Sequence, residues 1–315
     1  MKKILVTGAV GQIGSELVPR LREKYGNDNV VAAGHRKAPT EELKNAGPFV
    51  TIDTTNKEQI EAVVDEHGID TIYHLASLLS AVGEQKPQLA YFVNNQSLYN
   101  ILEIAREKQL ERIMYPSSIA VFGPETPRDN TPNETVLKPT TMYGISKVHG
   151  ELMGNYYFQK FGVDSRSVRY PGIISSGTEP GGGTTDYAVD IFYHAVKGEP
   201  YKCFLKEDAT LPMMYMPDAL KAIIDLADAD INALSHHADF NLAAMSFSPA
   251  ELAAEIQKEL PEFKVTYEPD FRQAIAESWP KSIDDSAARE EWGWKPDYDI
   301  TSMTKDMIKE LSARL

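Results

Sequence analysis

The chain has 315 residues, of which 42% are hydrophobic and 25% are charged, and its formal net charge is −14. This composition is ordinary for a globular protein with a sizeable core, so disorder is not expected. The lysines and arginines form no block that could neutralise a row of phosphates, which argues against nucleic acids and anionic membrane surfaces as main partners.

Cysteine, histidine and hydropathy patterns narrow the class of protein further. Cys203 is the single cysteine, so an intrachain disulfide is impossible and a reducing compartment, the cytoplasm, is expected. The seven histidines have neither HExxH nor HxxxH spacing, and we expect no metal site. No apolar stretch reaches about 18 residues without interruption, so no membrane span is expected.

From the N-terminus, short β-branched runs alternate with amphipathic helical patterns. The predicted strands lie at 2–8, 29–34, 70–76 and 112–118, and the predicted helices lie at 15–25, 56–67 and 88–108. A helix at 143–161 and a strand at 165–174 continue the series. Such alternation is typical of parallel strands joined by right-handed crossovers. The sequence therefore predicts an α/β fold with a Rossmann-type doubly wound parallel sheet.

The regular alternation ends near Gly172. The stretch 175–187, SSGTEPGGGTTDY, predicts a flexible loop, and smaller elements follow, including a short strand within 262–270 and a terminal helix over 302–315. We expect residues 1–172 to form a dinucleotide-binding domain to which later segments return. Residues 173–315 are expected to form a smaller C-terminal α/β substrate-binding region.

The first turn carries a glycine pattern. Gly8, Gly11 and Gly14 form GxxGxxG between the first predicted strand and the first helix. Glycine permits a tight turn and lets backbone N–H groups and the helix N-terminus approach a pyrophosphate, so this context predicts a dinucleotide site. The alternative is a turn that is merely tight. Pro19 falls inside the same helix, where proline costs about 3 kcal/mol unless the helix kinks or starts late.

The second strand ends without the acidic residue that usually binds the adenosine ribose. Gly34 occupies that place, and His35, Arg36 and Lys37 follow, which could hold the extra phosphate of NADP or could simply stack on adenine or face solvent. Asp53, after the third strand, is placed either to accept a hydrogen bond from adenine or to cap the helix that follows.

Tyr143 and Lys147 lie four residues apart in PTTMYGISKVHGE, a spacing that stacks two side chains on one face of a helix. A phenol is a poor base at neutral pH unless a nearby cation favours phenolate. Ser118 lies upstream at a predicted strand end, where side chains face the ligand crevice. The alternatives are a solvated lysine on an ordinary amphipathic helix and, for Ser117 and Ser118, turn capping.

Several motifs together resemble those of a known superfamily. TGAVGQIG, HLAS, PSSIAVFG, YGISK and RYPGII are similar to the extended short-chain dehydrogenase/reductase superfamily, which includes nucleotide-sugar epimerases and dehydratases. More narrowly, SSIAVFGPETPRDNTP, PGGGTTDYAVDIFY, MMYM and ESWPKSIDDSAAREEWGW resemble the zinc-free, short-chain L-threonine 3-dehydrogenases over nearly the whole chain. The first set of motifs is specific to the superfamily, and the second indicates the substrate.

The resemblance implies roles for the catalytic group. Tyr143 would be the general base, Lys147 its electrostatic partner and a ribose ligand, and Ser118 a hydrogen-bond donor to the reacting oxygen. The C3 hydroxyl of L-threonine would be oxidised to 2-amino-3-oxobutyrate, with the hydride passing to NAD. The family's usual acid is absent at Gly34, and NAD remains the expected cofactor because the similarity elsewhere is close.

The resemblance also implies which residues bind the cofactor and the substrate. Those expected at the cofactor are Gly8, Gly11, Gln12, Ile13 and Gly14 at the pyrophosphate, His35, Arg36, Asp53 and Thr54 at the adenosine, Leu75 and Ala76 beneath the cofactor, Ile173 near the carboxamide, and Tyr143 and Lys147. Those expected around the amino acid are Ser80, Thr184, Thr185 and Trp279. The alternatives are a loop that is only mobile and a tryptophan that only packs in the core.

Two other functions remain open from the sequence. A nucleotide-sugar epimerase or dehydratase would use the same Ser118, Tyr143 and Lys147, with Lys202, Lys206 and Arg272 as possible charge for a second diphosphate. A redox sensor that binds dinucleotide without turnover would need none of the three. The family also implies a homodimer formed through helices 88–108 and 143–161, whose apolar faces permit it.

Overall fold

A seven-stranded parallel sheet forms the centre of the protein, as the computed structural model shows for residues 1–179 and 181–315. The strand order is β10-β6-β5-β4-β1-β2-β3. The strands are β1 (Ile4–Thr7), β2 (Val30–Gly34), β3 (Phe49–Thr51), β4 (Thr71–His74), β5 (Arg112–Ser118), β6 (Ser165–Tyr170) and β10 (Phe240–Asn241). The order reverses beside β1, and the prediction of a doubly wound Rossmann-type sheet is confirmed.

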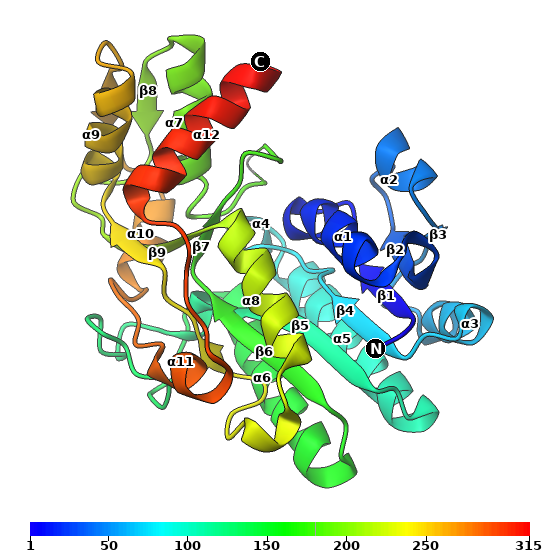
Figure 1. Ribbon diagram of the computed structural model, residues 1–315. Coiled ribbons are helices and arrows are strands. Elements are labelled where there is room, and N and C mark those ends of the chain that lie inside the picture. The colour runs from blue at the N-terminus through cyan, green and yellow to red at the C-terminus, as the bar shows by residue number, and fades with distance from the viewer. Residues whose placement is uncertain (180) are drawn as a thin grey trace.

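Helices cover both faces of this sheet (Figure 1). One face is covered by α1 (Gln12–Tyr25) and α8 (Met216–Asp228), and the other by α3 (Lys57–His67), α5 (Pro87–Lys108) and α6 (Met142–Phe161). Each face has its own buried hydrophobic cluster, because the strands are apolar on both sides as buried parallel strands require. Helix α1 continues through Pro19 as one element. Of the described residues, none belongs to a helix long and apolar enough to cross a membrane.

The predicted strand at 165–174 is wrong in one respect, because it is two strands. Strand β6 ends at Tyr170, Pro171 interrupts the ladder, and β7 (Gly172–Ile174) begins in a different sheet. Proline has no N–H to donate to a neighbouring strand, so the chain can leave the large sheet at this residue. The break lies at the sheet edge where the site residues gather.

The C-terminal half builds a second lobe and also returns to the large sheet (Figure 1). In the lobe, β7 pairs with β9 (Leu211–Tyr215), which pairs with β11 (Met245–Phe247), and β8 (Tyr201–Cys203) pairs with β12 (Val265–Tyr267). Helices α7 (Tyr187–Lys197), α9 (Pro249–Glu259) and α12 (Ile300–Arg314) pack together around a third hydrophobic cluster. Strand β10 returns to pair with β6.

The remaining helices are short and lie between these elements. They are α2 (Glu41–Asn45), α4 (Ser80–Gln85), α10 (Arg272–Glu277) and α11 (Ser286–Trp292). Residues 175–179 and 181–186, from the predicted loop, form neither helix nor strand, and Pro180 lies outside the described residues. These residues lie between β7 of the smaller sheet and α7 in the sequence.

Glycines let α6 approach β5 closely. A Cβ on Gly154 would lie 1.9 Å from the Tyr115 hydroxyl oxygen, and the same hydroxyl donates a hydrogen bond of 3.0 Å to the Gly150 carbonyl. The Tyr115 side chain of β5 therefore lies directly against the backbone of α6, with no α6 side chain between them at this level.

A buried ion pair joins the same helix to the sheet. Glu151 of α6 and Arg169 of β6 are 2% and 3% exposed, and the guanidinium donates to both carboxylate oxygens at 2.9 and 2.8 Å. The Ser117 hydroxyl of β5 donates to Glu151 at 2.5 Å, and Arg169 also donates to the Asn241 side chain of β10 at 3.1 Å. Three neighbouring strands and one helix thus share one charged network.

We expect Glu151→Gln to lower the free energy of unfolding by about 3 kcal/mol, because the substitution leaves the Arg169 charge buried without its counter-ion. Urea unfolding followed by circular dichroism measures this change. Glu58→Gln, at an exposed position of α3, is the control and should change stability by about 0.5 kcal/mol or less. Equal effects of the two substitutions would contradict the assignment.

Candidate active site

The predicted site residues follow the carboxyl ends of the parallel strands. Gly8 comes after β1, Gly34 ends β2, Leu75 comes after β4, and Ser118 and Tyr170 end β5 and β6. These ends meet at one edge of the large sheet, and the strand order reverses beside β1. In open α/β sheets this edge is where ligands bind.

The glycine turn after β1 has no room for side chains. Gly8 has a φ of +71°, and a Cβ there would lie 2.8 Å from the Ala76 backbone nitrogen. A Cβ at Gly14 would lie 2.3 Å from the Gly8 carbonyl oxygen, to which Gly11 N–H donates a hydrogen bond of 2.9 Å. A bare, tight turn of this kind lets a pyrophosphate approach the backbone, so these residues fit a dinucleotide.

The start of α1 carries a second sign of the same fit. Gly11 precedes the helix, and within the described part of the chain no side chain caps it, so the first N–H groups remain available to an anion. The Gln12 amide nitrogen is buried and has no hydrogen-bond partner among the described residues. Gln12 and Ile13 both line the main cavity of the site. A buried donor beside a helix N-terminus is suited to a phosphate oxygen.

The predicted adenosine residues lie together at the ends of β2 and β3. His35 Nε2 lies 3.9 Å from Asp53 Oδ2, and His35 and Arg36 are exposed. Hydrogen bonds from Thr55 lower the pKa of Asp53, so its carboxylate stays ionised. Asn56, and not Asp53, caps α3, which overturns the capping alternative for Asp53.

Thr54 has a structural role at the same level of the sheet. Its hydroxyl lies 2.8 Å from the Ser97 hydroxyl in a buried pair, and its carbonyl accepts a hydrogen bond of 3.1 Å from Asn100. These contacts join the end of β3 to α5. The predicted adenine contact of Thr54 remains a prediction.

The start of α6 is pressed against the segment that follows Ser118. Thr141 caps the helix by accepting a hydrogen bond of 3.1 Å from Gly144 N–H. A Cβ on Gly144 would lie 2.2 Å from the Ala120 carbonyl oxygen. Glycine at this position therefore brings Tyr143, its neighbour on α6, close to the end of β5.

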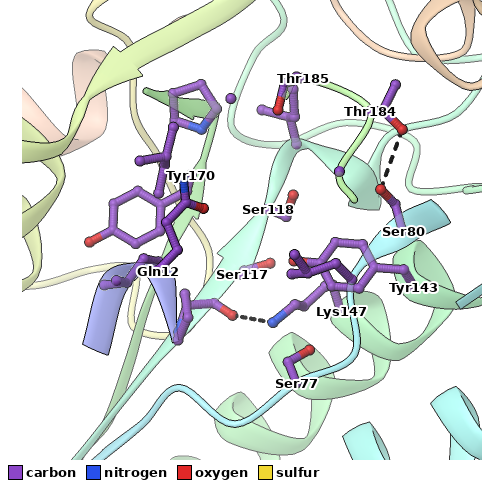
Figure 2. A pocket seen from close by; sticks show the side chains of 18 of the residues that line it. Gln12, Ser77, Ser80, Ser117, Ser118, Tyr143, Lys147, Tyr170, Thr184 and Thr185 are labelled. Atoms are coloured by element: carbon purple, nitrogen blue, oxygen red, sulfur yellow. Dashed lines mark hydrogen bonds between the residues drawn. The ribbon is translucent and has the colours of Figure 1, made fainter. Parts of the chain in front are cut away.

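Tyr143, Lys147 and Ser118 line one cavity (Figure 2). The Lys147 nitrogen lies 5.2 Å from the Tyr143 ring centroid and donates a hydrogen bond of 2.7 Å to the Pro116 carbonyl. The Ser118 hydroxyl accepts a hydrogen bond of 3.2 Å from Ala120 N–H. Ser118 therefore caps a turn, as the alternative held, and also faces the cavity beside the phenol.

Burial sets the protonation of this group. It raises the pKa of Tyr143 to about 12, and a hydrogen bond from Ser118 opposes the rise. It lowers the pKa of Lys147 to about 8 in spite of the negative charge of Glu151. It also lowers the pKa of His74 to about 3, with the Lys147 charge adding to the effect, so His74 stays neutral. By themselves, these residues therefore leave the pKa of Tyr143 raised, whereas a role as general base requires a lowered pKa.

The residues predicted around the amino acid line the same cavity, whose volume is about 140 Å³. Ser80 and Thr184 are buried, and their hydroxyl oxygens lie 3.3 Å apart (Figure 2). Thr185 also lines the cavity from the loop before α7. Trp279 is 4% exposed and packs in the core of the C-terminal lobe, yet it forms part of the cavity wall, so the two interpretations of this tryptophan hold together.

The predicted residues fall into two groups by position. Those that line the main cavity are Gln12, Ile13, Leu75, Ser80, Ser118, Tyr143, Lys147, Ile173, Thr184, Thr185 and Trp279. Those that lie outside its wall are Gly8, Gly11, Gly14, His35, Arg36, Asp53, Thr54 and Ala76. The second group follows β1, β2, β3 and β4, where the extended adenosine and pyrophosphate portions of a dinucleotide are expected.

Sequence reasoning missed three residues of this site. Glu151 lies on α6 one further turn beyond Lys147, and continuing the four-residue spacing would have found it. Asp186 and Ser77 line the cavity, and the Asp186 carboxylate accepts hydrogen bonds from Gly182 and Gly183 N–H at 2.7 and 2.8 Å. A carboxylate directly after GGGTT was the available signal for Asp186, and the available signal for Ser77 was its place at the end of the HLAS motif.

Known proteins match this chain over nearly its full length. An uncharacterized epimerase/dehydratase of Staphylococcus haemolyticus is 50% identical over 100% of this chain and 99% of its own length. A GalE-like L-threonine dehydrogenase from Cupriavidus necator, in its holo form, is 53% identical with a TM-score of 0.96, and the match covers 98% of this chain and 99% of that one. A monomeric L-threonine 3-dehydrogenase from a metagenome is 46% identical with a TM-score of 0.95 and 99% coverage of both chains.

The family match covers most of the chain. The NAD dependent epimerase/dehydratase family matches residues 4–243, a range that includes the glycine turn, the end of β5 and the paired Tyr143 and Lys147 of α6. Together with the full-length relative, this match establishes that the chain belongs to the NAD dependent epimerase/dehydratase family.

Proposed function

We propose that the protein is an NAD-dependent L-threonine 3-dehydrogenase. The observation that carries this proposal is the meeting of Ser118, Tyr143 and Lys147 with the hydroxyl groups of Ser80, Thr184 and Thr185 in one small cavity beside a dinucleotide turn. The solved L-threonine dehydrogenases from two sources, which match the chain from end to end, support the choice of substrate.

The cofactor binds along the carboxyl edge of the large sheet. Gly8, Gly11 and Gly14 give the pyrophosphate access to the backbone, and Gln12 donates its unpaired amide hydrogen. His35, Arg36 and Asp53 surround the adenosine, while Leu75, Ala76 and Ile173 lie toward the nicotinamide. When bound, NAD supplies the acceptor for the hydride from C3 of threonine and a positive charge beside the phenol.

The chain's own residues handle the proton. The Tyr143 oxygen, as phenolate, takes the proton of the substrate hydroxyl, and the Ser118 hydroxyl hydrogen-bonds to the same substrate oxygen. Lys147, held to the Pro116 carbonyl, stabilises the phenolate electrostatically and binds the ribose. Loss of a hydride and a proton from threonine leaves a carbonyl at C3, so the product is 2-amino-3-oxobutyrate.

Hydroxyl groups orient the amino acid. Ser80, Thr184 and Thr185 face the cavity, and the only ammonium or guanidinium among its described lining residues belongs to Lys147. We assign the recognition of the substrate carboxylate and ammonium to these hydroxyls and to nearby backbone groups. Residues 173–315, which include the segment carrying Thr184 and Thr185, form the substrate-binding region, and segments such as β10 return to the dinucleotide-binding domain of residues 1–172.

A cytoplasmic location accords with this function. Cys203, the single cysteine of the sequence, is buried and unpaired, which suits a reducing compartment where NAD-linked metabolism takes place.

The direct test is NADH formation from L-threonine and NAD, measured by absorbance with the wild type and with Tyr143→Phe. We expect turnover in the wild type and a loss of at least about 1,000-fold in the variant, because phenylalanine cannot accept the proton. NAD binding, measured by calorimetry, should persist in Tyr143→Phe and shows that the variant is folded.

The outcomes separate the alternative functions. Turnover of UDP-sugars without turnover of threonine would support a nucleotide-sugar epimerase or dehydratase. Tight NAD binding without turnover of any alcohol would support a redox sensor and would contradict the dehydrogenase.

The pH dependence of kcat/KM follows from the pKa of Tyr143, which burial raises, and the pKa of Lys147, which burial lowers. Tyr143 must be ionised to act as a base, so below its raised pKa the rate with threonine should rise with pH, whereas Lys147 loses its charge as the pH rises through about 8. We therefore expect kcat/KM to rise from pH 6 to 8 and to rise less steeply above pH 8.

Ser118→Ala removes the hydrogen bond that lowers the Tyr143 pKa, so the pH profile of this variant should move to higher pH.

The matched control for this profile is Ser286→Ala, an exposed position on α11 outside the cavity. Its pH profile should coincide with that of the wild type. An unshifted profile in Ser118→Ala would show that Ser118 does not act on the ionisation of Tyr143.

We also propose that the chain forms a homodimer through α5 and α6. Eight of the eleven exposed large hydrophobic side chains among the described residues lie on these two helices. They are Leu89, Tyr91, Phe92, Tyr99, Ile145, Leu152, Tyr156 and Phe161, with exposures between 41% and 63%. Helices α5 and α6 pack together and both expose apolar side chains. They can therefore pack against the same pair of a second copy in a four-helix interface.

Leu152→Glu should dissociate this dimer, because it places a charge on the most exposed apolar position of α6. Light scattering after size-exclusion chromatography should give twice the chain mass for the wild type and the chain mass for the variant. Phe271→Glu, which removes an exposed aromatic residue elsewhere, should leave the mass unchanged. A wild type of single-chain mass would contradict the dimer, as would a variant that remains dimeric.

A further inference from the structure

The adenosine end of the dinucleotide groove lacks its usual acidic residue. Gly34 ends β2, the strand whose carboxyl end normally presents a carboxylate to the ribose hydroxyls. A Cβ on Gly34 would lie 2.9 Å from the tip of the Phe49 ring and 3.5 Å from a Val10 methyl group. The Phe49 ring therefore occupies the space that the Cβ of an acidic side chain at residue 34 would need. The end of β2 has no room for that carboxylate.

Positive charge surrounds the same place. His35, Arg36 and Lys37 follow Gly34 directly and are all exposed, and within the described residues neither Arg36 nor Lys37 takes part in an ion pair. Asp53 is the acid that faces them, 3.9 Å from His35, and its oxygens also accept hydrogen bonds from Thr55. Two permanent cations and one histidine thus lie beside one carboxylate at the ends of β2 and β3.

A carboxylate at the end of β2 discriminates against NADP because it repels the 2′-phosphate, whereas a nearby arginine accommodates it. Here the repelling group is absent, and Arg36 is free to form charge-assisted hydrogen bonds with phosphate oxygens. Asp53 opposes this effect, but it lies at the end of β3, where the adenine ring is expected, rather than at the end of β2.

We infer that the adenosine end of this site accepts a 2′-phosphate as well as a 2′-hydroxyl, so that the chain binds NADP in addition to NAD. The specificity-determining residues are Gly34, which removes the repulsion, Phe49, which fills its place, and Arg36, which contacts the phosphate. This inference deepens the proposed function and rests on its dinucleotide site, but it does not depend on threonine as the substrate.

Calorimetric titration of the full-length protein with NAD and with NADP tests the inference without turnover. In the wild type we expect the two Kd values to differ by less than about tenfold. Arg36→Gln should raise the ratio of the NADP Kd to the NAD Kd at least tenfold, because a charged hydrogen bond to phosphate is lost. Arg20→Gln, which removes an exposed arginine of α1, is the matched control and should leave the ratio unchanged.

Two further measurements separate the role of Gly34 from that of Arg36. Gly34→Asp combined with Phe49→Ala should restore discrimination and raise the same ratio at least tenfold, since the repelling carboxylate then has room. Added salt should weaken binding of 2′,5′-ADP more than binding of 5′-AMP, because the two nucleotides differ only in the 2′-phosphate.

The inference is overturned if NADP binds more than about tenfold more weakly than NAD to the wild type. It is also overturned if Arg36→Gln weakens both cofactors equally. If the cofactors bind as expected and threonine is not oxidised with either, the proposed function fails while this inference stands.

Discussion

The hydrogen bonds that hold α6 against the end of β5 are the constraint on which the rest of the site depends. Lys147 donates to the Pro116 carbonyl, and Glu151, one turn further along the helix, accepts the Ser117 hydroxyl. Two side chains of one helix thus hold two consecutive residues of one strand, and Ser118 is the next residue of that strand. The contacts that join the helix to the sheet are therefore the contacts that bring Ser118 and Tyr143 into one cavity.

The negative charge of Glu151, which helps to hold α6 against β5, is neutralised in the interior of the sheet and not in the cavity. Arg169 neutralises Glu151 in the sheet interior and extends the network to Asn241 of β10, a strand contributed by the C-terminal half of the chain. The cavity above is left with the Lys147 ammonium, whose pKa burial lowers to about 8, and the Tyr143 phenol, whose pKa burial raises to about 12. Both shifts oppose the ionised forms that proton abstraction needs. In the proposed function, the positive charge of an oxidised nicotinamide would favour phenolate, so Tyr143 would become competent as the base once the hydride acceptor is bound.

The local periodicities of the sequence were sufficient for most of the fold. The helices predicted at 56–67, 88–108 and 143–161 agree with α3, α5 and α6 to within one residue at each end. The strand predicted at 165–174 failed because Pro171 ends one ladder and allows another to begin in a different sheet. The short elements of the C-terminal lobe carry too few turns or alternations for periodicity to place them.

The residues of the candidate site also divide into those that local sequence patterns predict and those that only tertiary packing brings together. The glycine turn and the four-residue spacing of Tyr143 and Lys147 are local patterns, because a tight turn and a helical face each depend on a few consecutive residues. Neither the meeting of Ser80 with Thr184 nor the contact of Gly34 with Phe49 could be read from local pattern, since each joins segments that are separate in the sequence. The sequence by itself thus determined the alternating α/β elements, the glycine turn and the helix face that carries Tyr143 and Lys147. Only the tertiary structure decided which distant side chains share a cavity or a buried charge, because those pairings follow from the register of the sheet and the packing of helices on it.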